Sequence, residues 1–262
     1  MELVLSYLVT GACAGLLAGL FGVGGGLIIV PALALLLPPQ GVDPAIVMQL
    51  AIGTSLSVIA FTSMSSTLAH HRRGGVLWPV FRALVPGLIV GALLGAGLAH
   101  LLSGEVLRRI VGIGALLVAA KMAFELKPGG ARNLPGNLGL GVSGGVIGSL
   151  SSLIGIGGGS LTVPFLSLCR VPMQQAVGTS AACGLPIAWA GALGFVISGW
   201  SLPNLPPWSL GYVALPGLLG IAVASVSCAP LGARLAHRLP AQRLKQAFAL
   251  LLAVIGVRML MS

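Results

Sequence analysis

The residues best suited to hold a small charged ligand are two runs of glycine, each inside a long apolar stretch. The first run is Gly22-Val23-Gly24-Gly25-Gly26, and the second is Gly155-Ile156-Gly157-Gly158-Gly159. Adjacent glycines weaken a helix by roughly 1 kcal/mol each relative to alanine, so each run predicts a helix break. The short apolar segment after each break would begin with N–H groups that lack a helical partner, and such a terminus favours an anion. The backbone positions predicted to approach the anion are Gly24, Gly25, Gly26, Gly157, Gly158 and Gly159.

Polar side chains at matching places in the two halves extend this candidate site. A glutamine followed by Gly-Thr-Ser occurs in each half, and the second break is also followed by Ser160 where the first has Leu27. Neutral hydroxyls could bind an oxyanion and still release it, although serine and threonine in helices also bond to the carbonyl four residues earlier. We expect the second half to supply more polar contacts. The side chains predicted to bind are Gln49, Thr54, Ser55, Ser160, Gln174, Thr179 and Ser180.

Two alternatives stay open for these residues. The glycines could simply allow close helix packing, and the glutamines could bridge helices near the ends of spans. Pro31 and Pro164, five residues after the last glycine of each run, are expected to kink or end the short helices and so to act in gating. No cysteine or histidine spacing predicts a metal site or a cofactor. Of the histidines, His71 is the best candidate for coupling to protons.

The composition places these motifs in a membrane protein. Of the 262 residues, 56% are hydrophobic and 7% are charged, whereas soluble domains carry about 25% charged residues. The net charge of +10 is explained by basic loops between apolar spans, so no nucleic-acid partner is expected. The chain also lacks the glycine-lysine loop of nucleotide-binding proteins, which argues against ATP hydrolysis.

The elements that position the glycine runs form two similar sets. We predict an all-α polytopic bundle of two inverted repeats, each with a glycine-broken or re-entrant helix pair, with about eight full spans and two short helices. The repeats occupy residues 1–126 and 137–262, joined by a linker at 127–136. Similar segments recur in the same order, including Pro86-Gly87 and Pro216-Gly217. The positive-inside rule predicts cytoplasmic loops at Arg72-Arg73, Lys127–Arg132 and Arg234–Lys245 of a multi-pass cell-membrane protein.

At this point the sequence resembles the sulfite exporter TauE/SafE family of membrane permeases. The resemblance rests on the Val-Pro after each glycine run (Val30-Pro31 and Val163-Pro164), on the Gly-Thr-Ser of the next span, and on the turn with His71, Arg73 and Gly75. It covers nearly the whole chain. It implies transport of small sulfur-containing anions such as sulfite, sulfoacetate or related organosulfonates.

We therefore expect a secondary transporter, not an enzyme, that holds an anion between two glycine-headed helix termini and works by alternating access. One alternative is an anion channel, in which the same helix termini line a pore. A second is an intramembrane hydrolase, for which Ser143 would be the nucleophile. The expected partners are the anionic substrate and membrane lipid, while coupled protons and a homo-oligomer stay open.

Overall fold

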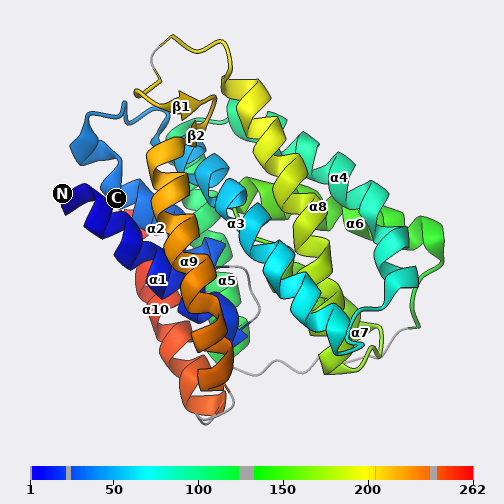
Figure 1. The fold of residues 1–262 in the computed structure, drawn as a ribbon. Helices are drawn as coiled ribbons and strands as arrows, with labels where there is room; N and C mark the ends of the chain where they lie inside the picture. The colour runs from blue at the N-terminus through cyan, green and yellow to red at the C-terminus, as the bar shows by residue number, and fades with distance from the viewer. Residues whose placement is uncertain (1, 22–24, 124–132, 204, 237–240, 262) are drawn as a thin grey trace.

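The computed structural model describes residues 2–21, 25–123, 133–203, 205–236 and 241–261. The fold is all-α apart from one short hairpin (Figure 1). The helices of the first half are α1 (Glu2–Phe21), α2 (Gly26–Leu36), the 3-10 turn η1 (Pro38–Gln40), α3 (Val47–Arg72), α4 (Trp78–Leu101) and α5 (Gly104–Ala123). The second half contains α6 (Asn137–Ile154), α7 (Gly159–Leu168), α8 (Met173–Gly199), the strands β1 (Ser209–Leu210) and β2 (Val213–Ala214), α9 (Leu215–Ala236) and α10 (Ala241–Met261).

Among the described residues, four helices are long and apolar enough to cross a membrane, namely α3, α4, α6 and α8. Shorter apolar stretches lie in α1, α2, α7, α9 and α10. The predicted membrane bundle is therefore confirmed in its class, whereas about eight full spans remains a prediction. Each glycine run separates two helices, as predicted, and the helices after the breaks, α2 and α7, have 11 and 10 residues.

Helices α3 and α8 form the centre of the bundle and run antiparallel. Every residue from 47 to 60 of α3 is buried. As the residue numbers rise along α3, the residue numbers of the contacts on α8 decrease. The contacts that show this are Leu56 with Gly191, Ser63 with Gly184, and the hydroxyl of Thr67 with the carbonyl of Ala181. A largely apolar sequence can form such a helix because its whole circumference is covered by neighbours.

Two further helix pairs pack through glycine, α1 against α9 and α6 against α4. At each contact a Cβ on the glycine would overlap a backbone carbonyl oxygen of the facing helix. The contacts are Gly11 with Ile221, Gly15 with Ser225, Gly144 with Leu84, and Gly148 with Leu88. Small residues let helix backbones approach this closely where lipid provides no hydrophobic drive between helices.

The numbering of these contacts corrects one detail of the predicted repeat. Leu84 and Ile221 occupy the same role and lie 137 positions apart, as do Leu88 and Ser225 (221 − 84 = 225 − 88 = 137). The same spacing pairs Pro216 with Pro79, and each is the second residue of its helix, α9 and α4. Pro86 therefore does not correspond to Pro216. The two Pro-Gly dipeptides pair in the sequence because they are identical, although they lie at different positions in their helices.

Candidate functional site

The two glycine breaks touch each other in the middle of the bundle. Gly25 caps α2 in a left-handed conformation with a φ of 72°, and Gly26 begins the helix. Gly26 packs so closely on the carbonyl oxygen of Gly155 that a side chain there would clash. Gly155 ends α6 with a φ of 74°. The structure therefore brings Gly25 and Gly26 against the second break, while Gly24 lies outside the described residues.

The second break is a loop whose N–H groups are hydrogen-bonded where it ends α6 but have no helical partner where it begins α7. At its start, the N–H groups of Gly155 and Ile156 cap α6 by bonding to carbonyls of the last turn, at 3.3 and 2.9 Å. At its end, Gly158 caps α7 without a side-chain hydrogen bond, and its backbone lies against that of Cys183 and Gly184 on α8. The first N–H groups of α7, beginning at Gly159, have no partner within the helix. They carry the positive end of its dipole.

Ser55 and Ser180 hold this loop in place. The Ser55 hydroxyl donates to the carbonyl of Gly155 at 2.9 Å, and the Ser180 hydroxyl donates to the carbonyl of Gly158 at 3.2 Å. Both serines are fully buried. Because their protons are used by the protein, these two residues position the break in this structure. Direct binding of an anion, as the sequence predicts for them, would require these bonds to be exchanged.

Four of the five buried hydroxyls with no hydrogen-bond partner among the described residues lie around the same break. They belong to Ser151 and Ser152 in the last turn of α6 and to Ser160 and Thr162 in the first turns of α7. Three of the four residues, Ser151, Ser152 and Thr162, are 0% exposed. An unpaired buried hydroxyl costs roughly 1–3 kcal/mol, so four around one loop are a reason to expect a ligand there.

The sequence pointed to Ser160 but not to Ser151 and Ser152. The signal was present: the serine pair comes shortly before the second break, and the corresponding positions before the first are Ala18 and Gly19.

Thr54 and Thr179 have equivalent roles at two different connections. The Thr54 hydroxyl accepts the N–H of Ala214, just before α9, and the Thr179 hydroxyl accepts the N–H of Leu77, just before α4; both distances are 2.9 Å. The preceding glycines pack on nearby carbonyls: Gly53 lies on that of Tyr212 and Gly178 on that of Gly75. These threonines therefore anchor the connections that lead into α9 and α4, and they do not face the glycine loop.

The remaining predicted residues lie further from the break. Gln49 donates to the carbonyl of Leu102 at 3.0 Å, while Gln174 is exposed in the first turn of α8. Each glutamine precedes the serine of its helix by six residues, or about 9 Å along the axis. Pro31 and Pro164 lie inside α2 and α7, so neither ends its helix.

The break is electrically neutral in the described part of the chain. Neither glycine segment nor the residues bonded to them include an acidic or basic side chain. No group of three or more potential metal ligands occurs among the described residues. The side chains of His71 and His100 are hydrogen-bonded to Trp78 and Tyr212, and no hydrogen bond recorded among the described residues joins Ser143 to a histidine. Tyr212 lies in the hairpin, where burial raises the pKa of its phenol.

Comparison with known proteins identifies similar chains. The family model described as Sulfite exporter TauE/SafE matches residues 7–259, which confirms the predicted resemblance. A probable membrane transporter protein of Haemophilus influenzae is 38% identical over 260 residues, covering 99% of this chain and 98% of its own. A probable membrane transporter protein of Methanocaldococcus jannaschii is 26% identical, covering 97% and 94%. YunE of Bacillus subtilis, also a probable membrane transporter protein, is 32% identical, covering 73% and 77%. No solved structure gives a significant match.

Proposed function

Because the chain belongs to the sulfite exporter TauE/SafE family, we propose that it is a secondary transporter for small sulfur-containing anions such as sulfite, sulfoacetate or other organosulfonates. The observation that carries this proposal is the set of buried hydroxyls, without partners among the described residues, around the second break. Hydroxyl protons and a helix N-terminus both stabilise negative charge. Together with Gly26, which touches the break, they make a seat for one oxyanion.

The neutrality of this seat suits a carrier. A lysine or arginine would add the Coulomb attraction of a full positive charge to its hydrogen bonds, so it would bind the anion more tightly and slow its release. Several weaker donors can instead bind the anion while letting it leave. Ser55 and Ser180 keep the loop in shape during this exchange, because each holds one of its carbonyls.

The two halves, 1–126 and 137–262, are proposed to be inverted repeats joined by the 127–136 linker. Three sets of contacts support this assignment. The glycine contacts of α1 with α9 correspond to those of α6 with α4, Thr54 corresponds to Thr179, and the equivalent helices α3 and α8 run antiparallel. Equivalent helices that run in opposite directions indicate an inverted relation, and the broken helices then meet between the repeats.

Basic residues support the proposed orientation. Arg72 and Arg73 end α3, and their loop lies beside the start of α8, next to Arg170, since Gly75 contacts the backbone of Gln174. The hairpin before α9 lies at the other end of the bundle from α7 (Figure 1). We propose that the arginine end is cytoplasmic and the hairpin end faces outward. The linker 127–132 and the basic loop at 237–240 lie outside the described residues.

The test is flux of labelled sulfite, sulfoacetate and sulfate into proteoliposomes that contain the purified chain. We expect saturable flux of a sulfur anion, reduced about tenfold or more in a Thr162→Val variant, because one hydrogen bond to a charged group is worth about 1.5–3 kcal/mol. The matched control is Ser149→Ala, since that hydroxyl is satisfied by the carbonyls of Gly91 and Gly145. No flux of any anion from well-folded protein would contradict the transporter assignment.

The same vesicles distinguish a carrier from an anion channel. A carrier exchanges labelled for unlabelled anion across the membrane and accumulates label transiently, whereas a channel shows conductance without such counterflow. Repeating the flux across pH gradients tests coupling to protons, which the neutral break does not itself provide. Light scattering of the purified protein tests the homo-oligomer.

A further inference from the structure

The buried interior of the described chain contains polar side chains but no charged ones. Thirteen polar side chains are buried, and all of them are hydroxyls except the amide of Gln49. Of the described acidic and basic side chains, three are partly covered, and each lies near a helix end: His70 on α3, and Arg108 and Lys121 on α5. Within the part of the chain that the structure describes, an anion at the second break therefore has no buried lysine or arginine to pair with.

The positive potential at the second break comes from dipoles alone. The N-terminus of α7 carries roughly half an elementary charge, because its first N–H groups have no partner within the helix. The hydroxyls of Ser151, Ser152 and Thr162 add donors on fully buried residues, and they have no partner among the described residues. The facing glycine run also contains no charged residue by sequence. These groups can offset one negative charge far better than two.

The number of charges on the anion decides whether such a site can hold it. The cost of moving an ion out of water rises with the square of its charge, whereas its attraction to fixed dipoles rises in proportion to the charge. A dianion therefore loses about four times as much hydration free energy as a monoanion of the same size, and it regains only about twice the interaction. Without a buried cation, this difference favours monoanions.

Hydroxyls also suit an oxyanion that carries its own proton. Each hydroxyl has one proton to donate and two lone pairs that can accept, whereas lysine and arginine can only donate. The hydroxyls of Ser151, Ser152, Ser160 and Thr162 have neither role filled among the described residues. They can donate to the oxygens of hydrogen sulfite and also accept its proton, which needs an acceptor once it is buried.

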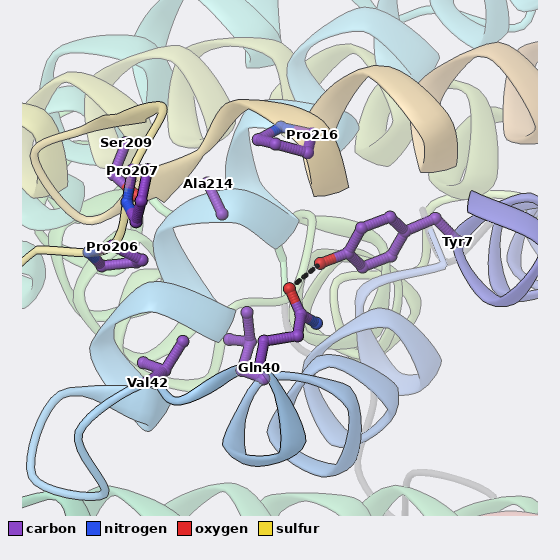
Figure 2. A pocket seen from close by; sticks show the side chains of 9 residues that line it. Tyr7, Gln40, Val42, Pro206, Pro207, Ser209, Ala214 and Pro216 are labelled. Atoms are coloured by element: carbon purple, nitrogen blue, oxygen red, sulfur yellow. Dashed lines mark hydrogen bonds between the residues drawn. The ribbon is translucent and has the colours of Figure 1, made fainter. Parts of the chain in front are cut away.

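A cavity at the hairpin end of the bundle is uncharged as well. It has a volume of about 210 Å³, and none of the nine residues that line it is charged at neutral pH (Figure 2). The Tyr7 phenol donates to the Gln40 side-chain oxygen at 3.0 Å, and Ser209 lies across the cavity from this pair. This cavity therefore also lacks a cation that could compensate a second negative charge.

We propose that the site at the second break accepts only singly charged anions, so that sulfite is transported as hydrogen sulfite and organosulfonates are transported as monoanions. This inference rests on the proposed function, because it specifies the charge of the species that the same site holds. Sulfate, and sulfoacetate with both of its acidic groups ionised, are dianions and are transported poorly.

The first test compares the flux of labelled sulfite with that of labelled methanesulfonate in proteoliposomes, from neutral to alkaline pH and with equal pH on both sides. Each anion is kept far below its KM, and flux through protein-free vesicles is subtracted. Methanesulfonate is the matched control, because it stays a monoanion throughout this range and so reports any effect of pH on the protein. We expect the ratio of sulfite flux to methanesulfonate flux to fall about tenfold for each pH unit above the pKa of hydrogen sulfite.

The ratio of the two fluxes separates the outcomes. A ratio that stays constant or rises with pH would show that the sulfite dianion is carried, and it would overturn the proposal while leaving the proposed function intact. Absence of flux of every anion from well-folded protein would instead overturn the proposed function.

The second test adds the missing charge. Ser160 lies in the first turn of α7 and is only partly covered, so a longer side chain can extend from this position. In a Ser160→Lys variant we expect sulfate to compete with methanesulfonate uptake at least about tenfold more strongly than in the uncharged control Ser160→Met. Equal competition by sulfate in the two folded variants would overturn the proposal that the lack of a cation excludes dianions. The pH test on the unaltered chain does not depend on either variant.

Discussion

The two glycine breaks have the same backbone design but different surroundings. The helix after the first break begins Gly26-Leu27-Ile28-Ile29, with all four residues buried. The helix after the second begins Gly159-Ser160-Leu161-Thr162, and the turn before it adds Ser151 and Ser152. Both breaks contain the glycines, whereas the hydroxyls occur only around the second break.

This difference separates what the architecture needs from what the ligand needs. Glycine is required twice because the breaks press against each other at Gly26 and Gly155, whatever they bind. Under the proposed function, hydroxyls are required only around the second break, where the oxyanion would be seated. The first break would then form an apolar wall that covers this site and excludes water, which would strengthen each hydrogen bond inside it.

The largest effect should come from disturbing the shared backbone design. Gly26→Ala puts a Cβ onto the carbonyl oxygen of Gly155, and we expect it to lower the unfolding free energy by about 3 kcal/mol. Gly97→Ala is the control, because a Cβ there meets nothing within 4 Å and the change should stabilise α4 by about 0.5–1 kcal/mol. Thermal unfolding in detergent measures both. Equal stability of the two variants would show that the breaks do not depend on close contact.

A smaller effect should come from exchanging polarity between equivalent positions. Thr162→Val removes an unpaired hydroxyl, so we expect flux to fall about tenfold while stability is unchanged or higher. Ile29→Thr places a hydroxyl at the matching position of the first break and should cost about 1–3 kcal/mol of stability without changing the KM for the anion. Flux and thermal unfolding of both variants give the comparison. A greater loss of transport in Ile29→Thr would move the seat to the first break.

The smallest effect should come from removing the hydrogen bonds that the Thr54 and Thr179 hydroxyls accept, which are alike in the two halves. Thr54→Val and Thr179→Val each remove the acceptor of one backbone N–H, at Ala214 and at Leu77. We expect each to favour opening of its own end by about tenfold in population, or about 1.4 kcal/mol. Maleimide labelling of thiols introduced at Ala214 and Leu77 measures this. Faster labelling at the same end in both variants would contradict the assignment of one of these hydrogen bonds to each end.

Much of the fold was readable from local pattern. The membrane class and the break at each glycine run follow from composition and from short motifs, because helix propensity and polarity act over a few residues. The prediction that the second half supplies more polar contacts, made from Ser160 against Leu27, stays a prediction. Repeat matching was less secure, since Pro216 pairs with Pro79 by its position in the helix and not with the identical dipeptide at Pro86.

The sequence by itself determined where this chain breaks its helices. Only the tertiary structure decided which hydroxyls are available. The Ser55 hydroxyl is hydrogen-bonded to a carbonyl 100 positions away, and the Thr54 hydroxyl to an N–H 160 positions away. The hydroxyls of Ser151 and Ser152 have no partner among the described residues. Hydrogen bonding depends on distance and direction in space, and for partners this far apart in the chain these are set by helix packing rather than by neighbouring residues.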